Sequence, residues 1–142
     1  MRRFKFNLEK ILQLRKFKEE EAKLALGQAI SALNAIEVKI KQTAVKLHNA
    51  AQNRFTNPQD IGIWDTYILR LEQEAEKLAE QAAQAEIIVE QRRVVYLETQ
   101  KDLKAMEKLK EKQQKDHRKE MFDRQMAEVD DITAGRRHLT QY

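Results

Sequence analysis

The sequence has no cysteine, one proline and three glycines among its 142 residues. Without cysteine the chain has no disulfide, no thiolate metal ligand and no cysteine nucleophile. Proline and glycine mark most tight turns, so their scarcity argues against a sandwich, a barrel or any fold with many chain reversals. We therefore expect long helices joined by very few turns.

Long apolar runs are also missing. No stretch approaches the ~20 consecutive apolar residues that a membrane-spanning helix requires. The first eighteen residues are basic but contain no continuous apolar segment, so they do not predict a secretory signal peptide.

Charged residues, in contrast, make up 35% of the chain, well above the ~25% of an ordinary globular domain. The net charge of +4 is unevenly spread. Residues 1–18 contain seven basic residues and one acidic residue, whereas residues 58–100 contain four basic and nine acidic residues. The two ends of any elongated fold would therefore carry opposite charge.

Apolar residues recur at alternating intervals of three and four along two long stretches, a pattern that predicts coiled-coil seams rather than broad globular faces. Arg15 and Glu19 interrupt the first stretch, and Arg92 interrupts the second. The apolar members of the first seam are Leu8, Leu12, Ala22, Leu26, Ala29, Leu33, Ile36, Ile40, Leu47 and Ala50, with Thr43 among them. The second seam contains Trp64, Ile68, Leu71, Ala75, Leu78, Ala82, Ala85, Val89, Tyr96, Thr99, Leu103 and Met106.

The ends of the two helices follow from local signals. Asn57-Pro58 is the only strong breaker, with Asn57 suited to an N-cap and Pro58 to a first helical position. Asn7 is a second candidate N-cap, and Gly135 is a candidate helix terminator. We predict one domain over residues 1–142, with a first helix at about 8–54, a turn at 55–57, a second helix at about 58–132 and a flexible tail at 133–142.

A short turn makes consecutive helices antiparallel neighbours. With the turn centred at Asn57, Leu8 lies opposite Met106, which is where the second apolar stripe ends. The sequence therefore predicts an all-α fold, an antiparallel two-helix coiled-coil hairpin whose second helix is longer than the first. In this register Arg15 lies toward Glu98, and Glu19 lies toward Arg92.

Signals for catalysis are weak throughout. The glycines are too dispersed for a phosphate-binding loop, and no zinc-binding spacing is present. His117 and Glu120 lie three residues apart on one helix, but two ligands hold zinc poorly. A narrow hairpin also has no deep core in which to enclose a substrate. We expect no enzyme, no cofactor, no metal and no small-molecule substrate.

The basic segment at residues 101–119 raises a different function, that of a coiled-coil arm that binds nucleic acid. Acidic residues are interspersed with the basic ones at helical spacing, whereas phosphate binding favours an unbroken positive surface. A solvated face or a protein-binding face explains the segment better, so no nucleic acid is expected as a partner. An oligomeric structural coiled coil is a third alternative.

Both ends of the chain resemble those of the flagellar export protein FliJ family. The opening Phe4-Lys5-Phe6 is followed by Leu8, Leu12 and Arg15 and by the run Glu19-Glu20-Glu21-Ala22. Near the other end, Arg118-Lys119-Glu120 precedes Glu128-Val129-Asp130-Asp131, which is similar to the family's basic-then-acidic ending. The resemblance extends over the whole length and includes the single turn in the middle of the chain.

The resemblance implies a non-enzymatic component of the bacterial flagellar type III protein export apparatus. It implies a stalk-like coiled coil that binds the hexameric export ATPase and links it to the membrane-embedded export gate and to export chaperones. It also implies a cytoplasmic location, peripherally associated with the cytoplasmic face of the inner membrane. The equivalent stalk protein of a virulence type III secretion system is an alternative.

We expect partner-binding residues at both ends of the hairpin. For the open end, which we assign to the ATPase, the candidates are Phe4, Phe6, Arg15, Phe122, Asp130 and Asp131. For the turn end, which we assign to the export gate, the candidates are Phe55, Trp64 and Tyr67. Trp64 occupies a seam position, so a role in packing competes with a role in binding.

Overall fold

A computed structural model describes residues 3–140 of the chain, and the side chains up to Arg136. Helix α1 spans Glu9–Asn53, a short 3-10 helix η1 spans Pro58–Asp60, and helix α2 spans Ile61–Thr140. No strand occurs among residues 3–140. The fold is therefore an all-α helical hairpin with a longer second helix, as predicted.

The first helix begins at Glu9, after an irregular segment at residues 3–6 and a turn at residues 7–8. The amide of Glu9 donates to the carbonyl of Phe6 at 3.2 Å, and the amide of Leu12 donates to the carbonyl of Leu8 at 2.9 Å. Leu8 is thus the residue whose carbonyl accepts the first helical bond, one position after the predicted cap at Asn7.

The turn between the helices depends on Asn57 and Pro58. Asn57 has an extended backbone, and its side chain accepts a hydrogen bond from the amide of Gln59 at 3.2 Å. Pro58 then occupies the first position of η1, where no amide is needed. The predicted cap is present, but it begins a 3-10 turn, so α2 starts only at Ile61.

Helix α2 ends later than predicted. It continues past Ile132 and through Gly135 to Thr140. No glycine among the described residues has a positive φ, so Gly135 is an ordinary helical residue and not a terminator. A single glycine costs a helix only about 1 kcal/mol relative to alanine, which the surrounding helix-forming residues can offset. Of the predicted flexible tail, residues 141–142 lie outside the described part of the chain.

Burial follows the predicted seams closely. Every residue of the first seam from Leu8 to Ala50 is buried or half-buried, including the charged Arg15 and Glu19. The second seam is protected in the same way from Trp64 to Met106, except at Arg92, which is exposed. The alternation of three and four therefore identified the packed face of both helices.

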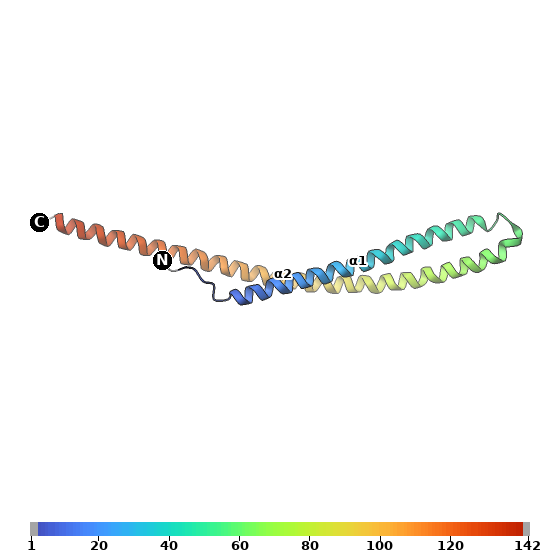
Figure 1. The fold of residues 1–142 in the computed structure, drawn as a ribbon, viewed down its shortest axis with the longest axis horizontal. Helices are drawn as coiled ribbons and strands as arrows, with labels where there is room; N and C mark the ends of the chain where they lie inside the picture. The colour runs from blue at the N-terminus through green and yellow to red at the C-terminus, as the bar shows by residue number, and fades with distance from the viewer. Residues whose placement is uncertain (1–2, 141–142) are drawn as a thin grey trace. The chain divides into compact units, whose positions relative to one another are not determined.

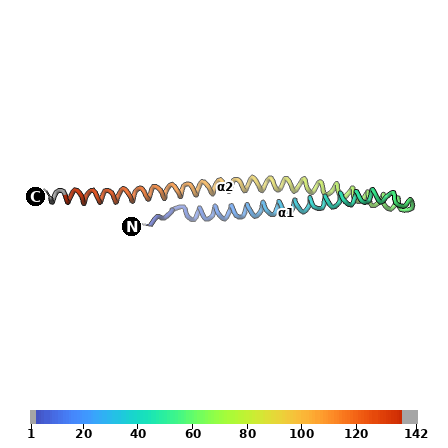
Figure 2. Tube along the Cα trace, turned by 90° about the horizontal axis from the view of Figure 1, so that it is seen from above, coloured from blue at the N-terminus to red at the C-terminus, as the bar shows by residue number. Residues whose placement is uncertain are grey.

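The contacts divide the chain into two compact units, which we describe separately. The turn unit contains residues 18–99, and in it α1 and α2 run in opposite directions from the turn (Figure 1). The terminal unit contains residues 1–17 and 100–142. In it the N-terminal residues lie beside α2, and α2 continues beyond them toward the C-terminus (Figure 2).

The register of the helices differs from the prediction by about one turn. In the terminal unit Arg15 pairs with Asp102 at 3.0 Å instead of approaching Glu98, and Glu9 pairs with Lys110 at 3.0 Å. The midpoint of both pairs falls within residues 58–60, not at Asn57. The reason is η1, which delays the start of α2 and places Leu8 level with residues near Lys110 instead of Met106.

Arg92, which was predicted to lie toward Glu19, lines a groove of the turn unit together with Lys18 and Glu21.

Over the described residues, neither helix combines the length and apolarity that crossing a bilayer would require.

Candidate partner-binding surfaces

The N-terminal arm, residues 3–8, packs against α2 in the terminal unit. Phe6 is buried, and the ring of Phe4 lies 5.6 Å from the ring of His117 at a tilt of 49°. A groove of about 440 Å³ lies beside the contact between the arm and α2, and it is lined by Phe4, Lys5, Phe6, Glu9, Lys110 and Gln114. Phe4 and Phe6 are the two residues of the arm that were predicted to contact a partner. Phe6 anchors the arm through its burial, whereas Phe4 keeps part of its surface exposed.

The position of the arm explains the burial of polar residues on α2 beyond the second seam. The second apolar stripe was predicted to end at Met106, and the seam positions that follow it, Lys110, Gln113 and His117, are polar. Gln113 and His117 are nevertheless half-buried, and the ring of Phe4 in the arm packs on His117, a residue of α2 beyond the level where α1 begins. The Phe-Lys-Phe spacing places both rings on one side of an extended segment, and this signal was available in the sequence.

Glu9 connects α1 to α2 at the base of the arm. Its Oε2 lies 3.0 Å from Nζ of Lys110, and its Oε1 accepts a hydrogen bond from Nε2 of Gln13 at 3.0 Å. The interaction with Lys110, followed by that with Gln13, holds the pKa of the Glu9 carboxyl below its ordinary value. Glu9 is therefore ionised over the neutral pH range, and it fixes the start of α1 against α2.

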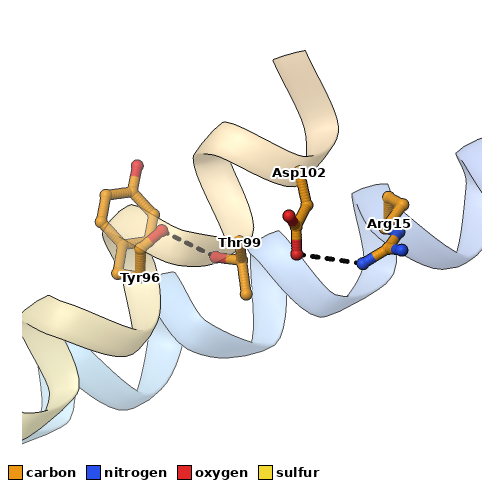
Figure 3. Close-up of polar contacts among 4 residues, drawn as sticks. All are labelled: Arg15, Tyr96, Thr99 and Asp102. Carbon is orange, nitrogen blue, oxygen red and sulfur yellow. Dashed lines mark hydrogen bonds and ion pairs between the residues drawn. The ribbon is translucent and has the colours of Figure 1, made fainter. Parts of the chain in front are cut away.

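Arg15 also bridges the two helices of the terminal unit. Its Nη1 donates to Oδ2 of Asp102 at 3.0 Å (Figure 3). The side chains of Arg15 and Asp102 are 38% and 54% exposed, so the pair is open to solvent and to an incoming partner.

In the turn unit the hydroxyl of Thr99 donates to the carbonyl of Tyr96 at 2.7 Å (Figure 3).

The part of α2 beyond the arm displays an apolar stripe with acidic neighbours, which we call the acidic stripe. Its large side chains are all exposed and follow one another at intervals of four, three and three: Phe122, Met126, Val129 and Ile132. Its acidic neighbours are Asp123, Glu128, Asp130 and Asp131. Phe122, Asp130 and Asp131 were predicted from the sequence, but the stripe was not, because its phase differs by about two residues from that of the hairpin seam.

A second exposed stripe lies on α1 in the same unit, and we call it the basic stripe. Ile11, Leu14 and Phe17 point away from the seam at intervals of three, and all three are exposed. Lys10 and Lys16 lie among them and are exposed as well. This surface was not predicted from the sequence either, although the helical spacing outside the seam is visible once the seam has been assigned.

In the turn unit, aromatic and apolar side chains gather beside the chain reversal. Phe55 is 76% exposed and carries the guanidinium of Arg54 over its ring at 5.4 Å. Arg54 Nε in turn lies 2.7 Å from Oδ1 of Asp65, an ion pair that links the end of α1 to the start of α2. Phe55 is thus held by its neighbour while most of its surface faces solvent.

Trp64 and Tyr67 form the wall of a groove beside this turn. Their rings meet edge to face at a centroid distance of 6.0 Å. The groove has a volume of about 460 Å³, and it is lined by Lys46, Asn49, Ala50, Asn53, Ile63, Trp64 and Tyr67. Trp64 is half-buried and therefore both packs and lines the groove, while Ile63 at its edge is largely exposed.

The arm, the two stripes and the turn groove expose apolar side chains of the kind that often contact other proteins. Comparison with known families shows to which family the chain belongs. Residues 4–141 match the family model described as the flagellar FliJ protein. The chain belongs to the FliJ family. No match was found among curated proteins or among solved structures.

Membership of the FliJ family makes the chain a component of the flagellar export apparatus, which is a type III secretion system. FliJ proteins are non-catalytic components of that apparatus and associate with its machinery. The match covers the arm, both helices and the acidic stripe, so all of these surfaces belong to the FliJ region. No cluster of three metal-ligating side chains occurs in the part of the chain that the structure describes.

Proposed function

We propose that this FliJ-family chain is a stalk-like coiled coil that binds the hexameric export ATPase and links it to the export gate and to export chaperones. ATP hydrolysis belongs to the partner. The chain acts at the cytoplasmic face of the inner membrane, as a peripheral component. The observation that carries this proposal is the presence of a distinct exposed surface in each unit of one hairpin.

We assign the ATPase contact to the terminal unit. Phe122 is 60% exposed on a stretch of α2 that no other described element covers, and Asp130 and Asp131 lie two to three turns beyond it. Exposed aromatic residues with charged neighbours are typical of protein contacts. Phe4, Phe6 and Arg15 support the same surface, since the arm and the Arg15–Asp102 pair hold α1 against α2.

We assign the export-gate contact to the turn unit. Phe55, Trp64 and Tyr67 lie close to the chain reversal, and the groove beside them is mainly apolar with a polar rim of Lys46, Asn49 and Asn53. Such a groove suits an apolar segment of a protein partner. Residues 58–100 carry a net negative charge, so the segment that binds here is expected to be basic at its edges.

The test separates the two assignments with two variants of the full chain. The first variant combines Phe122→Ala with Asp130→Lys, and the second combines Phe55→Ala with Tyr67→Ala. All four positions are at least partly exposed, so both variants should keep the helical circular dichroism spectrum of the wild type. Binding is measured by copurification with the hexameric ATPase and, separately, with the cytoplasmic part of the gate protein.

We expect the first variant to lose the ATPase and keep the gate protein, and the second variant to do the reverse. Loss of the same partner in both variants would reject the assignment of ends. Wild-type chain that neither copurifies with the ATPase nor changes its assembly or turnover would reject the function itself.

A further inference from the structure

One side of the turn unit is formed mainly by uncharged residues over several helical turns. A groove of about 370 Å³ identifies this side, because Ala25 of α1 and Val95 of α2 both line it. Residues three, four and seven positions apart share a side of a helix, so the exposed neighbours of these two residues follow from helical spacing. We call this surface the neutral face. It consists of Ala25, Gln28, Ala32 and Ala35 on α1 and of Gln81, Gln84, Ile88, Gln91 and Val95 on α2.

The other side of the same stretch is charged. Five exposed charged residues lie there: Lys23, Glu37, Glu86, Glu90 and Arg93. On the neutral face, in contrast, Ile88 and Val95 are 46% and 47% exposed among glutamines and alanines. Arg92, which comes from the seam, lines the groove at one end of this face together with Glu21, so its charge has an acidic neighbour. Exposed apolar side chains in such a setting are typical of a protein contact.

Charged residues return at both ends of the neutral face, and their signs are opposite. At the end farther from the turn, the first exposed charges on this side are Glu21 and Glu98, whereas near the turn they are Lys39 and Lys77. On α1 the midpoint between the two charges is residue 30, and on α2 it lies between residues 87 and 88. Both midpoints lie at one level of the hairpin, because residues 25 and 92 line the same groove and the helices run in opposite directions.

We propose that a second copy of this chain covers the neutral face, in an antiparallel dimer in which α1 lies on α1 and α2 lies on α2. The two-fold axis crosses both helices at the level of residues 30 and 87–88, so one face serves both copies. Glu21 of one copy then lies opposite Lys39 of the other, and Glu98 lies opposite Lys77. Each pair occurs twice, and the ion pairs frame a centre of apolar residues and glutamines.

Charge argues against a parallel pairing of the same two faces. In that arrangement the two-fold axis runs along the hairpin and places α1 of one copy on α2 of the other, with equal ends together. Glu21 would approach Glu98, and Lys39 would approach Lys77. Like charges placed side by side disfavour association, whereas the antiparallel arrangement replaces both repulsions with attractions. A partner of a different sequence would not require this symmetry of charge, which is why we favour a second copy.

The size of the neutral face sets the expected strength of the dimer. From Glu21 to Lys39 the helix rises roughly 27 Å at ~1.5 Å per residue, and two adjacent helices are about 20 Å wide. Each copy would therefore bury roughly 500–600 Å², or just over about 1,000 Å² in total, which is near the lower limit for a specific interface. We expect a weak dimer with a dissociation constant in the micromolar range.

The antiparallel dimer goes beyond the proposed function and does not rest on it. Neither the turn groove nor the acidic stripe includes a residue of the neutral face. The residues that we assign to the export gate and to the ATPase are therefore not those that the dimer uses.

The first measurement is sedimentation equilibrium of the isolated full chain over a range of concentrations and salt. We expect a monomer–dimer equilibrium whose dissociation constant rises with ionic strength, because the charges at both ends of the neutral face are exposed. A chain that stays monomeric into the high micromolar range overturns the proposal.

The decisive measurement exchanges the charges. Glu21→Lys alone and Lys39→Glu alone should each weaken the dimer at least roughly tenfold, because each places like charges opposite one another twice. Both substitutions in one chain should restore the dimer, since opposite charges then face each other again. The matched controls are Glu20→Lys and Lys41→Glu, which are exposed on the charged side and should leave the dimer unchanged. Failure of the combined variant to recover, or equal weakening by the controls, overturns the antiparallel dimer.

The absence of cysteine from the chain allows a direct test of the two-fold axis. Ile88 lies beside the axis, so the variant Ile88→Cys should form a disulfide-linked dimer on mild oxidation at micromolar concentration. Ala83→Cys, at an exposed site on the charged side of the same helix, should stay monomeric on a denaturing gel. Equal cross-linking of the two variants, or none at Ile88, overturns the proposal. None of these readouts involves the ATPase or the gate protein, so their outcome is separate from that of the proposed function.

Discussion

Individual residues in this hairpin are held by a few pairwise contacts because a two-helix fold has no deep interior. Only seven apolar side chains are buried among the described residues, and Leu12, at 1% exposed, is the most deeply buried of the large ones. The polar links Glu9–Lys110, Arg15–Asp102 and Arg54–Asp65 are all partly open to solvent. Exposed ion pairs contribute little to stability, because solvent screens them, so these pairs set register more than stability.

Glu9 offers a test of that role through its titration. Because the pKa of Glu9 is lowered in the folded chain, its ion pair stabilises the fold at neutral pH, and this contribution is lost as the pH falls through the folded pKa. We expect Lys110→Gln to raise the pKa of Glu9 toward its ordinary value. NMR titration of the Glu9 carboxyl checks this, with Lys112→Gln as the control. An unchanged Glu9 pKa in the Lys110 variant would contradict the pairing.

Gly27 tests the backbone at a single site. It lies in the middle of α1, its φ is not positive, and a Cβ placed there would meet nothing within 4 Å. Glycine costs a helix interior about 1 kcal/mol relative to alanine. We therefore expect Gly27→Ala to raise the free energy of unfolding by about 0.5–1 kcal/mol in urea denaturation. A destabilised variant would show that something packs closely against this site.

At the scale of the helices, stability comes from one narrow face on each. The seam positions of α1 and α2 are protected, while large apolar residues one or two positions away remain exposed. Removing a side chain from the seam leaves a cavity, whereas removing one from the outer face does not. The two classes of leucine should therefore respond differently to the same substitution.

Leu71 and Leu69 are a matched pair for this comparison, since they lie two residues apart on α2 in the turn unit. Leu71 is 3% exposed and Leu69 is 55% exposed. We expect Leu71→Ala to lower the free energy of unfolding by roughly 2–4 kcal/mol. Leu69→Ala should change it by no more than about 0.5 kcal/mol. Chemical denaturation of both variants measures the difference, and equal losses would refute the assigned seam.

At the scale of the whole chain, the last part of α2 differs from the rest of the described residues because it packs against no other element. The packed parts are the turn unit, the arm and α2 as far as His117, where Phe4 lies. The acidic stripe beyond them rests on no other described element. This stretch of α2 therefore adds little to the stability of the hairpin, and its apolar side chains remain exposed.

Truncation after Met121 tests this division. The shortened chain should keep its thermal unfolding midpoint within a few degrees of the wild type, because it loses no packing against α1 or the arm. It should lose ATPase copurification. Circular dichroism melting and copurification with the hexameric ATPase provide the measurements. A large drop in the midpoint would show that the removed residues pack on the hairpin.

Much of this architecture could be predicted because helical periodicity is a local property. The intervals of three and four identify the buried face of each helix before its partner is known, and Asn57-Pro58 identifies the reversal. The opening phenylalanines, Arg15 and the basic-then-acidic ending pointed to the FliJ family, which the family match confirms. These features depend on the order of residues along the chain and on helix geometry alone.

Only the tertiary structure decided how the two faces meet. The 3-10 turn at Pro58–Asp60 moved the register and gave Arg15 the carboxylate of Asp102 instead of Glu98. Phe4 of the arm packs on His117. The apolar residues of the acidic and basic stripes, in contrast, remain exposed. Periodicity says which side of a helix is apolar, but it does not say which segment will lie against it. That choice depends on the conformation of the turn and on contacts between residues about a hundred positions apart.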